Sequence, residues 1–283
     1  MTQVLLCVIL FLQQPNTQLP VAELPVAAIP ATPIPATPLT ATQQAPATQP
    51  ATTQQPANEQ LTPEEQQLLA SLTERAQKQW EKDIKELESL DQTQVDAKDS
   101  ILFIGSSSIR LWKSMAEDMS PWPTIRRGYG GAKFTDLVVF AERLVAKHDY
   151  RALAVFVAND ITGGTEDKSP EEVVALCKIL VKLVRKTHSD KPIFFIAITP
   201  NSKRFHVWDK IHKANQLIQQ YAESDPKIYF IDTEKYYIGE DGKPRDELFV
   251  EDKLHQNSAG YKQWAAIIKR QLDADLGSVA PPK

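Results

Sequence analysis

The chain has 283 residues, of which 42% are hydrophobic and 24% charged, a balance that predicts a globular protein with one sizeable core. Its formal net charge of −4, without any lysine- or arginine-rich block, argues against nucleic acid and anionic membrane surfaces as partners, because both require a clustered basic face. Only two cysteines occur, and Cys177 lies in the apolar run "VVALCKILVKLV", where we expect a buried, inert thiol.

The first residues resemble the apolar core of a signal peptide. The stretch "VLLCVILFL", Val4 to Leu12, has the length of such a core and is far shorter than the about 20 residues of a membrane-spanning helix. No lysine or arginine precedes Arg75, and a true start codon further upstream would explain the missing positive start. We therefore assign residues 1–13 to a signal-type region, predict no integral membrane segment, and expect a periplasmic or secreted protein.

Residues 14–60 differ sharply in composition from the rest of the chain. Of the 20 prolines, 11 fall at or before Pro63, among Ala, Thr and Gln, with the local repeat "IPATPIPATP". Such a segment buries too little apolar surface to offset the entropy lost on ordering. We predict an extended, disordered linker.

Ordered structure is predicted to begin at Thr62. The stretch "TPEE" offers an N-cap threonine, a proline at the first helical position and a glutamate three residues after the cap. Apolar residues recur at helical spacing up to about Leu90, at Leu69, Leu72, Ala76, Trp80, Ile84 and Leu87. We expect this first helix, within residues 61–96, to pack on a domain formed by residues 97–275, and residues 276–283 to be a flexible tail.

Strand-like and helix-like runs alternate through residues 97–275. Short, nearly all-apolar runs predict strands covered on both faces at Ile101–Ile104, Thr124–Arg126, Ala152–Val157, Ile193–Thr199 and Ile228–Ile231. Apolar stripes predict helices from Phe134 to Val145, from Val173 to Val184, from Val207 to Tyr221 and from Tyr261 to Leu272. The alternation predicts an α/β fold, a three-layer α/β/α sandwich with a mostly parallel five-stranded sheet.

Polar stretches fall where such a sheet binds ligands, outside the carboxyl ends of its strands. Ser106–Ser108 follow the first predicted strand, Gly128–Gly131 the second and Asn159 the third, while Asp252 and His255 precede the last helix. Polar groups scattered by chance would not all fall at these positions. We expect them to meet at one edge of the sheet.

Each stretch has a catalytic and a structural interpretation. A serine at a strand-to-helix turn can react, but it can also be an N-cap. Gly130 and Gly131 would let backbone N–H groups reach an oxyanion, although two glycines more often mark a turn. Asn159 could donate its amide to the same oxyanion or form an Asx-turn.

Asp252 and His255 carry the clearest indication. Three residues apart, the carboxylate can hold one ring N–H while the other ring nitrogen accepts a serine proton, and chance placement on the surface is the alternative. The remaining histidines lie on helical patterns or their ends, at His148, His188, His206 and His212.

Together these stretches resemble the SGNH/GDSL hydrolase family over roughly Trp80 to Leu272. "FIGSSSIRLW" is similar to the Gly-Asp-Ser block, "RGYGG" to the glycine block, "VANDI" to the asparagine block and "DKLH" to the Asp-x-x-His block. The long first helix and the segment "TPNSKRFHVWDKIHKAN" resemble an exported bacterial subgroup of GDSL-like lipases/acylhydrolases. The resemblance implies a flavodoxin-like SGNH hydrolase fold.

The resemblance also implies roles for individual residues. Ser107 would be the nucleophile, His255 the general base and Asp252 its orienting partner. The backbone N–H groups of Ser107 and Gly131 and the side-chain amide of Asn159 would form the oxyanion hole. Composition alone does not choose among the three serines.

Two positions depart from the family pattern. Ser106 stands where the family name has Asp, and Ala158 stands where a glycine is common. Neither side chain has a proton-transfer role, so we expect activity to be retained, while Ala158 affects how Asn159 is aimed. The G-x-S-x-G elbow of α/β-hydrolases is absent because "GSSSI" ends in isoleucine, which disfavours that fold.

We therefore predict a serine esterase or acylhydrolase that cleaves a carboxylic ester with a short acyl group, with acetyl on a carbohydrate as one candidate. Its partner would be a small-molecule or carbohydrate acyl ester. No cofactor is predicted, and no metal, because Asp252 and His255 alone do not make a zinc site. Residues that could border the substrate, or could simply be packing residues, are Arg110, Trp112, Arg204 and Trp208.

Two alternatives stay open. A catalytically silent, carbohydrate-binding relative of the same fold is disfavoured by the intact Ser107, Asn159, Asp252 and His255. A flavodoxin-like phosphate or nucleotide binder would use the serine loop as an anion nest. It lacks G-x-G-x-x-G and a Walker-type lysine and leaves His255 without a role.

Overall fold

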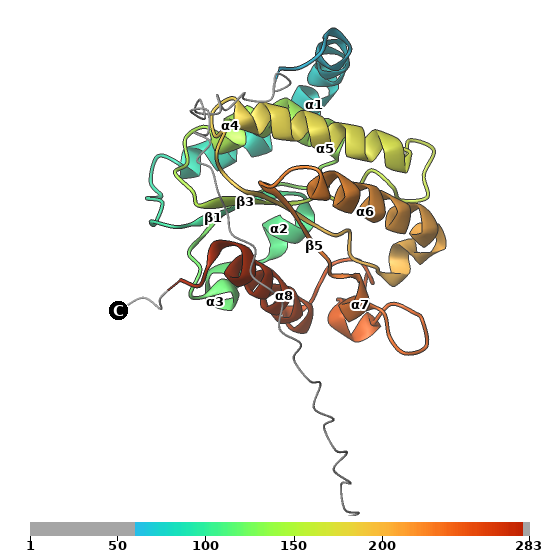
Figure 1. The fold of residues 1–283 in the computed structure, drawn as a ribbon. Helices are drawn as coiled ribbons and strands as arrows, with labels where there is room; N and C mark the ends of the chain where they lie inside the picture. Colours follow the sequence, from blue (N-terminus) through green and yellow to red (C-terminus); the bar gives the residue numbers. More distant parts are fainter. Residues whose placement is uncertain (1–59, 280–283) are drawn as a thin grey trace, which may run out of the picture. The chain divides into compact units, whose positions relative to one another are not determined.

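The computed structural model describes residues 60–279 (Figure 1). The predicted signal-type region (1–13), the predicted linker (14–60) up to residue 59, and residues 280–283 of the predicted tail lie outside the described residues. Within the part that is described, no helix is both long and apolar enough to cross a membrane.

A five-stranded parallel sheet forms the centre of the fold, with the strand order β2-β1-β3-β4-β5. The strands are β1 (Ile101–Gly105), β2 (Thr124–Gly128), β3 (Ala152–Phe156), β4 (Ile193–Ile196) and β5 (Ile228–Ile231). Every residue of β1, β3 and β4 is buried, as expected for strands covered on both faces. All five predicted strands are confirmed, although four of them differ at one end by one to three residues.

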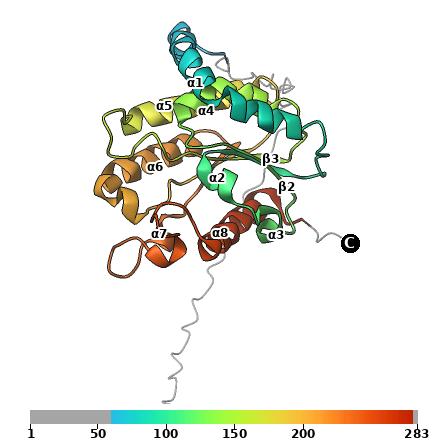
Figure 2. The ribbon, with the colours of Figure 1, turned by 180° about the vertical axis from the view of Figure 1, so that it is seen from behind.

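Helices cover both faces of the sheet, which confirms the predicted three-layer sandwich (Figures 1 and 2). One face carries α1 (Pro63–Leu90), α4 (Phe134–Val145), α5 (Pro170–Arg185) and α6 (Trp208–Glu223). The other carries α2 (Ser107–Leu111), α3 (Met115–Met119) and α8 (Ser258–Leu276). Elements too short to show an apolar stripe were not predicted: α2, α3, α7 (Glu234–Tyr237) and the 3₁₀ helices η1 (Ser202–Val207) and η2 (Asp246–Leu248).

The strand order creates a switch point beside β1. The chain passes from β1 to its neighbour β2 and then returns across β1 to β3 on the other side. Loops that leave the carboxyl ends of β1 and β3 therefore diverge, and the crevice between them is where sheets of this kind bind ligands.

The first helix, α1, begins with the predicted capping box. Thr62 Oγ1 accepts the N–H of Glu65, and the Glu65 carboxylate accepts the N–H of Thr62. The ion pairs that join α1 to α4 and α5 are Arg143–Glu81, Arg143–Glu88 and Lys182–Glu65. Trp80 lies on Gly130, where a Cβ would come within 2.4 Å of the indole, so a glycine is needed for this close approach.

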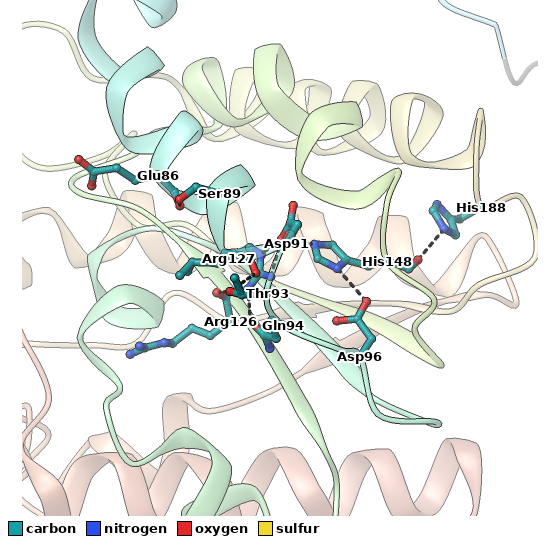
Figure 3. A network of polar contacts seen from close by, with 11 residues as sticks. Glu86, Ser89, Asp91, Thr93, Gln94, Asp96, Arg126, Arg127, His148 and His188 are labelled. Carbon is teal, nitrogen blue, oxygen red and sulfur yellow. Dashed lines mark hydrogen bonds and ion pairs between the residues drawn. The ribbon is translucent and has the colours of Figure 1, made fainter.

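A buried polar network holds the loop between α1 and β1 (Figure 3). The Arg127 side chain on β2 is 2% exposed, and its Nε donates to Asp91 Oδ1 at 2.8 Å. His148 Nδ1 lies 2.9 Å from Asp96 Oδ2, and the His148 carbonyl accepts from His188 Nε2 at 3.1 Å. Because an unpaired buried charge is costly, these pairs restrict the loop to the path that satisfies them.

Candidate active site

Side chains that follow β1, β3 and β4 meet the loop before α8 around one cavity of about 20 Å³. A cavity of this size has room for about one water-sized group. Its lining consists of Ser106, Ser107, Ser108, Phe156, Ala158, Asn159, Thr199, Asn201, Arg204, Phe249, Leu254, His255 and Gln256.

An abrupt turn at the end of β1 presents the serines. Gly105 has a φ of 139°, and a Cβ there would lie 1.9 Å from the carbonyl oxygen of Phe156, so no other residue fits. The N–H of Ser106 then donates to the same Phe156 oxygen at 3.0 Å, and α2 begins at Ser107. Ser106 is buried and occupies the N-cap position without a capping side-chain bond, whereas the Ser107 hydroxyl faces His255.

Ser107, His255 and Asp252 form a continuous hydrogen-bonded chain. Ser107 Oγ lies 2.9 Å from His255 Nε2, and His255 Nδ1 lies 2.6 Å from Asp252 Oδ2. Asp252 Oδ1 also accepts the backbone N–H groups of Leu254 and His255, each at 2.9 Å. Partial burial raises the pKa of Asp252, but the hydrogen bonds from His255 and Leu254 outweigh it and hold this pKa below its ordinary value. The carboxylate therefore stays ionised beside the imidazole.

The loop that carries Asp252 and His255 is a closed turn rather than part of a helix. The N–H of Val250 donates to the His255 carbonyl at 2.8 Å, and the N–H of Lys253 donates to the Val250 carbonyl at 2.9 Å. Lys253 has a φ of 56°, a left-handed conformation that is uncommon for a residue other than glycine. Asn257 then caps α8 by accepting the N–H of Gly260 at 3.0 Å.

Asn159 follows β3 and lines the same cavity as the serines. Its Nδ2 donates to the Ala132 carbonyl at 2.9 Å, and its Oδ1 accepts from Arg204 Nη2 at 2.6 Å. A primary amide has two N–H donors. The second N–H of Asn159 therefore has no hydrogen-bond partner within residues 60–279.

The neighbouring Asp160 has a structural role. Its carboxylate accepts the N–H of Phe134 at 2.8 Å and so caps the start of α4. Asp160 is 2% exposed, and burial raises its pKa to about 6 despite the hydrogen bond from Phe134. The adjacent side chains of Asn159 and Asp160 thus have different roles: Asn159 lines the cavity, and Asp160 caps α4.

Other residues singled out by the sequence are not all brought to the cavity. Arg204 lines it, but Arg110, Trp208 and Trp112 do not. Arg110 is exposed, Trp208 is half-buried and Trp112 is fully buried in the core. Gly131 is exposed and not among the lining residues, and nothing lies within 4 Å of the position its Cβ would take.

Thr199, Asn201 and Gln256 line the cavity although no sequence pattern indicated them. The predicted strand Ile193–Thr199 extends three residues beyond the observed β4, which placed Thr199 inside the sheet. Had the predicted strand ended at Ile196, the rule that ligands bind outside the carboxyl ends of strands would have indicated Thr199 and Asn201. Across residues 60–279, no group of three or more His, Cys, Asp or Glu side chains is arranged to hold a metal ion.

Comparisons with known proteins agree with this architecture. A family model described as GDSL-like lipase/acylhydrolase matches residues 99–263. The solved structure of a Streptococcus pneumoniae protein, described as a platelet activating factor, is 20% identical to this chain with a TM-score of 0.60. The match covers 75% of this chain and 100% of that protein. A GDSL-like lipase from Bacteroides thetaiotaomicron is 16% identical with a TM-score of 0.56, covering 68% and 97%. No curated protein matched the chain. At these identities, the likeness to the two structures is one of fold.

Proposed function

The chain belongs to the GDSL-like lipase/acylhydrolase family and is a hydrolase acting on ester bonds, and from this premise we propose that it is a serine esterase that releases a short acyl group through an acyl-serine intermediate. The observation that carries the proposal is the hydrogen-bonded chain from Ser107 Oγ through His255 to Asp252. A hydroxyl, an imidazole and a carboxylate in this order form a nucleophile, its base and the group that orients the base.

In the first step, Ser107 Oγ attacks the ester carbonyl carbon as its proton passes to His255 Nε2. The carbonyl oxygen becomes an oxyanion, which the backbone N–H of Ser107 and the free N–H of Asn159 stabilise. Gly131, the third donor that the family resemblance implies, does not line the cavity. Each such donor contributes about 3 kcal/mol in the transition state. The bond to the alcohol oxygen then breaks, and the imidazolium returns its proton to the leaving alkoxide, while Asp252 stabilises the imidazolium through Nδ1.

In the second step, water replaces the alcohol. His255 Nε2 removes a proton from the water as its oxygen attacks the acyl carbon on Ser107. The bond to Oγ breaks, the proton returns to Oγ, and the carboxylic acid leaves. Both steps use the same base and the same oxyanion donors, so one site performs the whole cycle.

The size of the cavity supports a short acyl group. A volume of about 20 Å³ beside Ser107, room for about one water-sized group, favours a methyl-sized acyl remainder over a long hydrocarbon chain. We take an acetyl ester as the first candidate substrate, with a small molecule or a carbohydrate as the alcohol part.

We also propose the division of the chain and its location outside the cytoplasm. Residues 61–96 would form the helical segment that precedes a hydrolase domain of residues 97–275, and the signal-type run "VLLCVILFL" would direct export. Fractionation of cells that express the full chain tests export, because a protein confined to the cytoplasm would contradict it.

Hydrolysis of p-nitrophenyl acetate by the full chain tests the catalytic proposal. We expect Ser107→Ala and His255→Ala each to lower kcat by a factor of about 1000 or more. The matched control His206→Ala removes an exposed histidine from η1 and should leave the rate unchanged. Equal rates for wild type and both site variants would overturn the proposal. Binding of an acetylated oligosaccharide without turnover would instead indicate a catalytically silent, carbohydrate-binding protein.

A further inference from the structure

Arg204 is a buried cation beside the reaction site for which the proposed mechanism has no role. The residue is 8% exposed and lines the cavity. Arginine is rarely buried without a carboxylate, because losing its hydration is costly. Within residues 60–279, Arg204 forms no ion pair, and its guanidinium instead donates to two neutral oxygens, the Ala158 carbonyl at 2.5 Å and Asn159 Oδ1 at 2.6 Å.

These contacts determine which way the Asn159 amide faces. A primary amide can rotate by half a turn and exchange its oxygen with its NH₂ group. Arg204 can only donate, so it selects Oδ1, and the Ala132 carbonyl can only accept, so it selects Nδ2. The flipped amide would set N–H against N–H and oxygen against oxygen. The remaining N–H of Asn159 is thereby held in a single orientation.

Arg204 is itself held in place by the loop after β4. Asn201 Oδ1 accepts the backbone N–H of Arg204 at 3.1 Å, and Asn201 Nδ2 donates to the Thr199 carbonyl at 3.1 Å. All three residues line the cavity. The guanidinium thus reaches Asn159 from a turn that is already organised, as positioning groups require.

We propose that Arg204 is a positioning residue for the ester reaction, which locks the Asn159 amide with its free N–H toward the oxyanion. The inference rests on the proposed function, since it needs an oxyanion to form at this site. The bond to the Ala158 carbonyl holds the backbone directly before Asn159, where the chain departs from the glycine of the family pattern. A charged donor on Oδ1 also polarises the amide and strengthens its N–H as a donor.

A double-mutant cycle tests whether Arg204 acts through Asn159. With p-nitrophenyl acetate, we expect Arg204→Gln to lower kcat by about ten- to a hundredfold with KM changed by less than about twofold, and Arg204→Lys to lose less. In the Asn159→Ala background, Arg204→Gln should have no further effect. The matched control Lys203→Gln removes an exposed charge from the same 3₁₀ helix and should leave kcat unchanged. Additive losses in the double variant would overturn the inference, as would an unchanged kcat in Arg204→Gln.

A second readout does not depend on turnover. The side-chain amide resonances of Asn159, identified by their loss in Asn159→Ala, should shift in Arg204→Gln and in Arg204→Lys but not in Lys203→Gln. If the Asn159 amide resonances did not shift in the two Arg204 variants, the proposed contact would be contradicted even if the enzyme were active. If wild type and Ser107→Ala were equally inactive, the esterase proposal would fail. Shifted resonances in that case would still support the contact between Arg204 and Asn159.

Discussion

Ser107 Oγ and His255 Nε2 lie 2.9 Å apart, although 148 positions separate the two residues in the sequence. The carboxyl end of β1 brings the serine to the edge of the sheet, and the closed turn before α8 brings the imidazole there. Because neither segment contacts the other in an extended chain, the pair exists only in the folded protein, and substitutions that disturb either support should reduce activity.

Asn159→Ala should lower kcat for p-nitrophenyl acetate by about a hundredfold or more, with KM nearly unchanged. The loss follows from removing one oxyanion donor, which acts on the transition state rather than on bound ester. Steady-state kinetics measure it. A rise in KM at constant kcat would show that Asn159 binds the substrate and does not stabilise the oxyanion.

Asp252→Asn should lower kcat at least tenfold without unfolding the protein. The amide can still accept the backbone N–H groups of Leu254 and His255, but it supplies no negative charge to the imidazolium. The control is Glu251→Gln, which removes a charge from the exposed neighbouring position. If both variants lost activity equally, the effect would come from the net charge of the loop.

Asp160→Asn should change the pH dependence of stability. Burial raises the pKa of Asp160 from 3.8 to about 6. At lower pH the group is neutral in both states, but as pH rises from about 4 to 6 the unfolded chain releases its proton first, so the wild type loses stability. The loss is complete by about pH 7 and amounts to about 3 kcal/mol.

The variant does not titrate, and its amide oxygen can still accept the N–H of Phe134. Its free energy of unfolding relative to wild type should therefore rise between about pH 4 and pH 7. Urea unfolding at several pH values measures the difference, and a constant difference across this range would contradict the raised pKa.

Gly105→Ala should destabilise the fold by about 2 kcal/mol or more, because a φ of 139° strains any side chain and the Cβ would collide with the Phe156 carbonyl. Gly131→Ala is the matched control for stability, since nothing lies within 4 Å of its added Cβ. Thermal unfolding of the two variants should differ clearly, and equal melting temperatures would argue against the strained turn.

The rate of hydrolysis should fall as the acyl chain lengthens from acetyl to butyryl and hexanoyl. A cavity of about 20 Å³ has room for about one water-sized group, so we expect a methyl group to fit better than a longer acyl chain. The ratio kcat/KM across this p-nitrophenyl ester series measures the preference. A rise toward hexanoyl would indicate a lipase-like site that opens on binding.

Local sequence patterns predicted most of the strands and long helices. The apolar runs at β1 to β5 and the capping box at Thr62 are properties of a few adjacent residues, and the structure has them where the sequence predicted them. The short helix α2 was missed because five residues are too few for a periodic stripe. The end of β4 was misjudged because "AIT" continues the apolar run beyond the last paired residue.

The sequence by itself determined the fold class and the family, because both depend on the order of strands, helices and short polar blocks along the chain. Only the tertiary structure decided which serine faces His255, which aromatic and basic residues stay away from the cavity, and that the guanidinium of Arg204 meets the amide of Asn159. Those contacts join loops from different strands, and their geometry depends on the packing of the whole sheet, which no local pattern encodes.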